Sequence, residues 1–175
     1  MTSDSARAKF LSVVAPHLDD AFMLARALAG NRRDAEDIVQ EAAIRALAAL
    51  ERALIASPRA WWLAIVRNTA LTFLTRNRPG VLAFVGDLDD LDAMRSSDPP
   101  ADSAETRLIA AQTGEQVRSA IAALPSPLRE TLILREINGL NYKEIAEATA
   151  APLGTVMSRL ARARTALAGK LENLR

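Results

Sequence analysis

The spacing of the apolar residues is the feature that most restricts how this chain folds. Apolar residues recur at intervals of three and four positions along most of the 175 residues. They do not follow the interval of two that a half-buried strand requires. Aromatic residues make up 4% of the chain, and alanine and leucine dominate, a mixture that favours helix over strand. The sequence therefore predicts an all-α fold.

Capping residues and helix breakers divide the first eighty residues into helices. The first helix is expected over about residues 5–28, with Pro16 either kinking it or starting a new one. Asp34 is expected to cap the second helix, and Ser57 with Pro58 to open the third, which ends near Pro79. The expected core-facing residues of the first two helices are Phe10, Val14, Leu18, Phe22, Ala25, Leu28, Ile38, Ala42, Leu47 and Leu50.

Capping residues and helix breakers also divide the last seventy residues into helices. A helix is expected over about residues 104–124, and Ser126 followed by Pro127 repeats the cap-and-proline start. Gly139 ends that next helix, in which Leu128, Leu132 and Leu134 are the apolar positions. Asn141 and Glu144 have the spacing of a capping box, which predicts that another helix begins there.

Charge is unevenly distributed along the chain. Residues 1–80 carry a net charge of +3, residues 81–105 of −6 and residues 106–175 of +4. The acidic segment also contains a proline pair and no long apolar period, which is typical of a solvated linker. We expect two small helical domains, 1–80 and 106–175, joined by an acidic linker at 81–105.

Two helical patterns meet near the C-terminus in KEIAEATAAPLGTVMSRLARAR, residues 143–164. The small residues of TAAPLG suit the short turn of a helix-turn-helix, whose second helix reads the DNA. In that second helix an apolar stripe is formed by Val156, Leu160, Ala163 and Leu167, and a polar stripe by Thr155, Ser158, Arg159 and Arg162. Arginine can bind guanine or phosphate, so the polar stripe is a candidate DNA contact. The alternative is an ordinary amphipathic helix whose arginines only solvate it.

A second polar stripe lies in SPRAWWLAIVRNTALTFLTRNR, residues 57–78. Helical projection places Trp62 on the core face and Trp61 at the head of a stripe with Asn68, Thr72 and Thr75. An exposed indole beside amide and hydroxyl groups suits stacking on an unpaired base. The alternative is that both tryptophans pack in the core.

Composition argues against several classes of protein. The chain has no cysteine, which excludes disulfides and thiolate metal sites, and a single histidine, His17, which disfavours zinc hydrolases and Ser-His triads. No cluster of nucleophile, base or metal ligands appears, so we expect no enzyme, no metal and no cofactor. The N-terminus lacks a signal-peptide core and no apolar run matches a membrane span, so we expect a cytoplasmic protein without membrane insertion.

Taken together, the segments resemble the extracytoplasmic-function sigma factors of the sigma-70 family, small two-domain bacterial transcription initiation factors. NRRDAEDIVQEA resembles region 2.2 of that family, PRAWWLAIVRN resembles regions 2.3 and 2.4, and residues 124–164 resemble its fourth region. The order LP, RE, G, EIA and GTVMSRLARAR in the last segment is highly specific. The resemblance covers nearly the whole chain.

The resemblance implies a function and its residues. Region 2 would bind the clamp helices of the β′ subunit of core RNA polymerase and melt the −10 promoter element. Region 4 would dock on the β flap and read the −35 element. The implied polymerase-binding residues are Asp34, Asp37, Gln40 and Glu41; those for the −10 element are Trp61, Arg67, Asn68, Thr72 and Arg76; those for the −35 element are Arg135, Tyr142, Pro152, Gly154, Thr155, Ser158, Arg159 and Arg162. An anti-sigma factor is the implied regulatory partner.

The sequence departs from the family pattern at three positions. Relatives often carry an acidic residue where Thr72 stands and a basic one where Met157 stands, and some carry a bulkier residue than Ala161. These departures bear on which promoter is preferred. Two other functions remain open, a stand-alone helix-turn-helix regulator and a sigma mimic that sequesters an anti-sigma factor.

Overall fold

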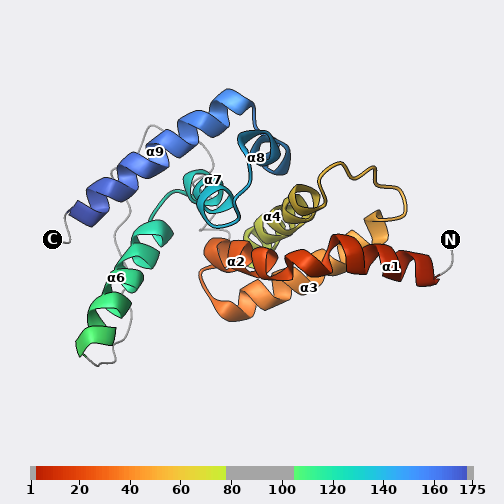
Figure 1. Ribbon diagram of the computed structural model, residues 1–175, viewed down its shortest axis with the longest axis horizontal. Helices are drawn as coiled ribbons and strands as arrows, with labels where there is room; N and C mark the ends of the chain where they lie inside the picture. Colours follow the sequence, from red (N-terminus) through yellow and green to blue (C-terminus); the bar gives the residue numbers. More distant parts are fainter. Residues whose placement is uncertain (1–2, 78–104, 173–175) are drawn as a thin grey trace.

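The computed structural model describes residues 3–77 and 105–172. Within those ranges all of the regular secondary structure is helical. The expected linker at 81–105 therefore lies, except for its last residue, outside the described residues. Figure 1 shows the arrangement of the helices. They are α1 (Ser3–Val13), the short 3-10 helix η1 (Ala15–His17), α2 (Leu18–Ala29), α3 (Arg32–Ala49), α4 (Pro58–Asn77), α6 (Glu105–Ala122), α7 (Ser126–Glu136), α8 (Tyr142–Thr149) and α9 (Leu153–Glu172). The all-α prediction is confirmed for the described part of the chain.

Pro16 starts a new helix rather than kinking a single one. It lies in η1, between α1 and α2. A 3-10 turn has three residues per turn, so it shifts the phase of the apolar stripe. As a result α2 buries Ala21, Leu24, Ala25 and Leu28, whereas Leu18 is 40% exposed. The prediction that Leu18 belongs to the core face was wrong for this reason.

The second predicted helix, α3, is capped one turn earlier than expected. Its N-cap is Asn31, whose side-chain oxygen accepts the backbone N–H of Asp34 at 2.9 Å, so the prediction of Asp34 as the cap was wrong. The buried stripe of α3 runs through Ala35, Ile38, Ala42 and Ala46. Leu47 is one position, or about 100°, further round the helix and is 46% exposed, which corrects the prediction that it is buried.

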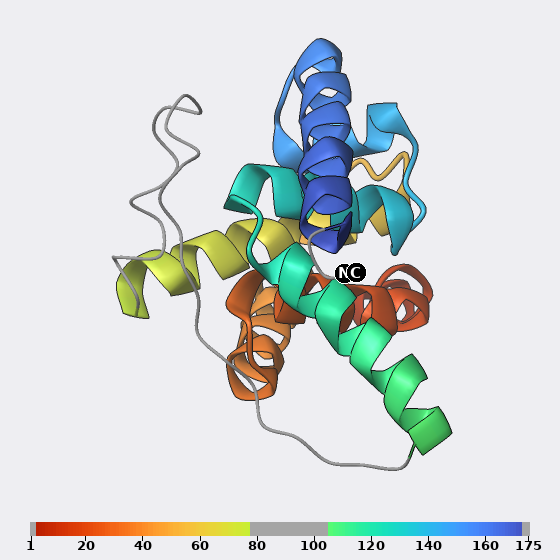
Figure 2. The same cartoon turned by 90° about the vertical axis from the view of Figure 1, so that its left-hand side faces the viewer.

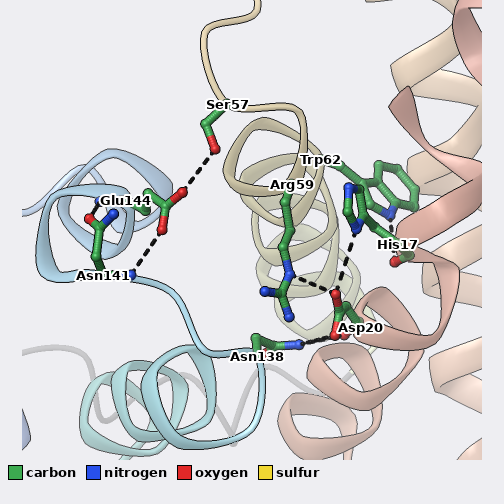
Figure 3. A network of polar contacts seen from close by, with 8 residues as sticks. All are labelled: His17, Asp20, Ser57, Arg59, Trp62, Asn138, Asn141 and Glu144. Carbon is green, nitrogen blue, oxygen red and sulfur yellow. Dashed lines mark hydrogen bonds and ion pairs between the residues drawn. The ribbon is translucent and has the colours of Figure 1, made fainter. Parts of the chain in front are cut away.

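Trp62 lies at the centre of the N-terminal helices. Its side chain is fully buried, and its indole Nε1–H donates to the backbone oxygen of His17 at 3.2 Å (Figure 3). The prediction that Trp62 lies on the core face is therefore confirmed. Trp61 is half-buried and packs at the edge of the same core.

The C-terminal helices agree closely with the sequence prediction. Asn141 and Glu144 form the expected capping box of α8, and Gly139 adopts a φ of +66°, a conformation that favours glycine. Leu128, Leu132 and Leu134 are buried. Helix α7 begins one residue early, with Pro125 rather than Ser126 at the N-cap position.

The two halves of the chain pack against each other. Helix α8 contacts α4, and α7 contacts both α2 and α9, so that α7 lies between α9 and α2 (Figure 1). In the view of Figure 2, α8 and α9 lie above α1, α2 and α3. A single hydrophobic cluster includes Trp62 and Val66 from the first half and Leu134, Leu140 and Ile145 from the second. Periodicity identifies apolar faces but does not say what covers them, so this packing could not be predicted.

Candidate nucleic-acid interface

A helix-turn-helix is present at the predicted place. Helix α8 ends at Thr149, Ala150 turns the chain with a φ of +51°, and α9 begins at Leu153. Val156, Leu160 and Ala163 are buried and hold α9 against its own domain, and Leu167 is half-buried. The apolar stripe of α9 is therefore the one that the sequence predicted.

Most of the residues expected at the −35 element lie near the start of α9 and are accessible. Pro152, Gly154, Ser158 and Arg162 are exposed, and Thr155 is half-buried. The Ser158 hydroxyl donates to the backbone oxygen of Thr155 at 3.0 Å. These side chains form a small polar surface at the N-terminal half of the second helix, which is the part of a recognition helix that reaches base edges.

Two of the expected −35 residues, Arg135 and Tyr142, contact each other at the start of α8 and do not lie on α9. The guanidinium of Arg135 lies over the ring of Tyr142, 5.1 Å from its centroid, and donates to the backbone oxygen of Leu140 at 2.9 Å. Both side chains are half-buried. In this arrangement Arg135 fixes the turn that precedes the helix-turn-helix.

Arg159 differs from its neighbours on α9. Its side chain is 20% exposed and lies 3.9 Å from the carboxylate of Glu130, while its Nε is buried without a hydrogen-bond partner. Arg164, five residues further along, contacts α7 by donating to Glu136 at 2.6 Å. This hydrogen bond raises the pKa of Arg164 above its usual range.

The expected −10 residues are distributed along α4. Asn68, Thr72 and Arg76 are exposed, and the Thr72 hydroxyl donates to the backbone oxygen of Asn68 at 2.9 Å. Arg67 is only 16% exposed, because its guanidinium is paired with Glu130 of α7. The accessible part of this stripe therefore lies in the C-terminal half of α4.

The expected polymerase-binding residues form the first half of α3. Asp37 and Gln40 are exposed, and Asp34 and Glu41 are half-buried. Asp34 accepts the side-chain amide of Asn31 at 2.9 Å, and Glu41 pairs with Arg45 one turn later. Acidic residues early in a helix also favour its dipole, so this surface stabilises α3 as well as presenting negative charge.

Glu130 is the functional candidate that the sequence analysis missed. It is 2% exposed and lies between Arg67 and Arg159. The signal in the sequence was a charged residue among the apolar positions of SPLRETLIL. A carboxylate that is buried at such a position requires a partner. Its partner Arg67 is 63 positions away and could not be identified from spacing.

The residues that the structure describes contain neither a metal-binding cluster nor a membrane-spanning helix. Within residues 3–77 and 105–172 no group of three or more His, Cys, Asp or Glu side chains could hold a metal ion. No described helix has both the length and the apolar character needed to cross a membrane.

Comparisons with known proteins match both halves of the chain. The family model for sigma-70 region 2 matches residues 13–79, and the one for sigma-70 region 4 matches residues 114–167. Among solved structures, the sigma factor RpoE of Bartonella quintana, in complex with the anti-sigma factor NepR, superposes with a TM-score of 0.67 at 25% identity, covering 97% of this chain and 98% of that one. CnrH in complex with the cytosolic domain of CnrY gives a TM-score of 0.63 at 24% identity, covering 94% and 88%, and supports the fold alone.

Curated relatives extend over most of the sequence. The chain is 31% identical over 157 residues to the ECF RNA polymerase sigma factor SigE of Mycolicibacterium smegmatis, covering 89% of this chain but only 58% of that longer protein. It is 35% identical over 149 residues to the ECF RNA polymerase sigma-E factor of Escherichia coli, covering 81% and 75%. The corresponding factor of Haemophilus influenzae is 34% identical over 151 residues, covering 82% and 78%. With both sigma-70 regions matched in order around a helix-turn-helix, the chain belongs to the extracytoplasmic-function RNA polymerase sigma factors of the sigma-70 family.

Proposed function

We propose that the chain is an alternative sigma factor that binds core RNA polymerase in the cytoplasm and directs it to promoters with particular −35 and −10 elements. The observation that carries the proposal is that each sigma-70 region presents an exposed polar helix face, one on α4 and one on α9. The domains assigned are 1–80 for region 2 and 106–175 for region 4, with the acidic linker at 81–105 between them.

In this proposal α9 enters the major groove of the −35 element. Its exposed start, with Gly154 and Ser158, faces the base edges, and Arg162 binds a base or a phosphate one turn later. Apolar packing through Val156 and Leu160 holds the helix rigidly, so that these contacts are positioned before the DNA arrives. The exposed Met157 provides no charge where relatives often have one, which reduces phosphate affinity at that point.

Helix α4 acts on the −10 element. Asn68 and Thr72 offer hydrogen bonds to an unpaired base, Arg76 binds the backbone, and the edge of Trp61 offers a stacking surface. Extruding a base costs a few kcal/mol of stacking energy. Contacts on α4, together with the binding energy of the polymerase, offset this cost.

Helix α3 provides the surface for core polymerase. Asp37, Gln40 and Glu41 contact the clamp helices of the β′ subunit, and region 4 docks on the β flap. A solved neighbour is a sigma factor in complex with an anti-sigma factor, which supports the same kind of control for this chain. We propose an anti-sigma partner that covers the polymerase-binding surfaces.

In-vitro transcription with core polymerase and a randomised promoter library tests the proposal. The chain should select templates sharing two elements at a fixed spacing, and no selected transcript should appear without it. A stand-alone repressor would instead protect promoter DNA in the absence of polymerase. A mimic would bind an anti-sigma factor and give no transcription.

The polymerase surface is tested separately by Asp37→Arg combined with Gln40→Ala. Both positions are exposed, so the double variant should keep the melting temperature of the parent. It should lose co-purification with β′. Normal recovery of β′ would reject the assignment of this surface.

A further inference from the structure

Helix α9 carries large apolar side chains on the part of its surface that is open to solvent. Within residues 114–172, whose side chains the structure describes, the exposed large apolar residues are Ile137, Leu153 and Met157. Two of the three lie in the first turns of α9, and Met157 is 52% exposed. The residues that bury α9 against its own domain are Val156, Leu160 and Ala163. Met157 therefore contributes little to the packing of the domain and is accessible to a partner.

The exposed face of α9 has two chemically different sides. Met157 lies about 40° round the helix from Ala161 and about 60° from Gly154, and all three are exposed. We call these three residues the apolar flank. The polar flank lies about 100–160° round the helix from Met157 and consists of Thr155, Ser158 and Arg162. Hydroxyl and guanidinium groups are thus gathered on one side of the face, and the other side has none among its three residues.

The guanidinium of Arg164 is bound within the protein. Arg164 lies about two turns after Met157 and therefore on the same side of α9. Its Nη2 donates to Glu136 Oε1 at 2.6 Å, and its Nε donates to the same oxygen at 3.2 Å. A guanidinium that is paired with a carboxylate of α7 offers less charge to a phosphate than one directed to solvent. The surroundings of Met157 therefore favour an apolar partner.

The neighbours of Met157 on the exposed face are small. A Cβ added at Gly154 would meet nothing within 4 Å, and Ala161 has only a methyl group as its side chain. Methionine is unbranched and has three rotatable bonds and a polarizable sulfur, so it adapts its shape to an apolar partner. The Met157 side chain can therefore reach beyond the surface of α9 without hindrance from either neighbour.

An apolar side chain in the major groove distinguishes thymine from the other bases. Thymine alone presents a C5-methyl group there, whereas cytosine presents an amino group that donates a hydrogen bond. Contact between a methionine side chain and the methyl group removes apolar surface from water on both sides. An amino group covered by the same side chain loses its hydrogen bond to water without a replacement. A methionine at this place should therefore favour thymine and disfavour cytosine.

We propose that Met157 is a specificity-determining residue of this chain, which selects thymine in the −35 element by contact with its C5-methyl group. Gly154 and Ala161 leave room for this contact, and the polar flank binds the neighbouring bases and phosphates. The inference rests on the proposed function, in which α9 enters the major groove of the −35 element. It adds that, where relatives often carry a basic residue, this chain reads a base by apolar contact.

The first experiment compares base preferences in the presence of core polymerase. A promoter library randomised across the −35 element is transcribed with the parent, with Met157→Ala and with Met157→Leu. At one position the parent should select thymine about fourfold more strongly than Met157→Ala does, the ratio expected for one buried methyl group. Met157→Leu keeps an apolar contact and should keep the preference. Preferences at the other positions should be the same in all three.

The second experiment removes the methyl group from the DNA. In the template that the parent selects most strongly, the thymine at that position is replaced by deoxyuridine, which lacks only the C5-methyl group. Promoter binding by core polymerase carrying the chain is measured by competition against the labelled, unmodified template. The substitution should weaken binding about fourfold for the parent and less than twofold for Met157→Ala.

Met23→Ala is the matched control, because it truncates a methionine of α2 that is 46% exposed and lies outside α9. It should respond to deoxyuridine as the parent does. Since Met157 is exposed, Met157→Ala and Met157→Leu should keep the melting temperature of the parent. A lost preference would then reflect the lost contact and not unfolding.

Two results would overturn the proposal: equal base preferences in the parent and Met157→Ala, or an equal effect of deoxyuridine on the two. Either result, obtained with a parent that selects −35 and −10 elements, would leave the proposed function standing. If the parent selects no template at all, the proposed function fails, and this inference fails with it.

Discussion

Ser57 donates its hydroxyl hydrogen bond to Glu144, 87 positions later, at 3.0 Å. The other carboxylate oxygen of Glu144 accepts the backbone N–H of Asn141 at 2.9 Å and so completes the capping box of α8. One carboxylate thus ends the turn before the helix-turn-helix and ties it to the start of α4 (Figure 3). The local signal for this residue was readable in the sequence, whereas its distant partner was not.

These two roles of Glu144 can be separated by mutation. Ser57→Ala removes only the contact between the halves and should lower the free energy of unfolding by about 0.5–1.5 kcal/mol. Glu144→Ala removes that contact and the cap together, so a further loss of about 1 kcal/mol is expected. Urea unfolding followed by circular dichroism measures both. Equal losses in the two variants would mean that the cap contributes nothing.

The adjacent tryptophans should respond very differently to truncation. Trp62→Ala empties a fully buried site and breaks the bond to His17, which should cost about 3–5 kcal/mol and leave little folded protein. Trp61 is half-buried, so Trp61→Ala should fold, with a loss of about 1 kcal/mol.

The role of Trp61 in DNA binding is tested by measuring transcription initiation. If the indole of Trp61 stacks on an extruded base, Trp61→Ala should reduce initiation about tenfold or more at saturating polymerase. Trp61→Phe, which keeps an aromatic face, is the matched control and should retain most activity. Full activity of a folded Trp61→Ala chain would remove this residue from the −10 site.

Local chemistry decided which structural features could be predicted. Pro16, Gly139 and the Asn141–Glu144 pair act on their own backbone neighbourhood, and each marks a helix boundary in the structure. The wrong cap for α3 arose where two local solutions competed. Asn31 and Asp34 are both good caps, and the choice of Asn31 also lets its amide bind the Asp34 carboxylate.

Contacts between the two halves of the chain could not be predicted from local sequence signals. Nothing in the spacing of α4 indicates that Arg67 faces a carboxylate on α7 while Asn68, the next residue, faces solvent. Arg159 likewise shares the polar stripe of α9 in projection, yet the structure places it beside Glu130. A helical projection shows on which side of a helix a residue lies. It does not show whether another helix covers that side.

Arg159 and Arg162 should therefore be tested singly. Arg162 is exposed, so Arg162→Ala should keep the parent's melting temperature and reduce −35-dependent initiation by about tenfold, the loss expected for one base contact. Arg159→Ala leaves Glu130 with less counter-charge. Because the contact is long and a fifth of the side chain is exposed, we expect only about 1–2 kcal/mol of destabilisation.

Thermal unfolding and in-vitro transcription, performed on the same preparations, separate these effects. Arg162→Lys is the control for charge, since it keeps a phosphate contact but not the two-pronged geometry. A promoter activity that does not fall in Arg162→Ala would contradict the placement of Arg162 at the DNA.

Two glycines allow a backbone requirement to be distinguished from a contact requirement. Gly139 has a φ of +66°, and an added Cβ would lie 3.8 Å from Arg59 Nη1, an ordinary contact distance. The strain of the left-handed conformation, rather than lack of space, should make Gly139→Ala about 1–2 kcal/mol less stable. Gly154 lies in the first turn of α9, and a Cβ there would meet nothing within 4 Å.

Gly154→Ala should consequently stabilise α9 by up to about 1 kcal/mol, because alanine has the higher helix propensity. If the start of α9 approaches the −35 bases closely, the added methyl group should nevertheless reduce initiation at −35-dependent templates. Gly169→Ala is the matched control, since it also adds a methyl group to α9 where nothing lies within 4 Å, but far from the proposed contact. A Gly154→Ala chain that is more stable and as active as Gly169→Ala would show that the DNA does not approach α9 at this residue.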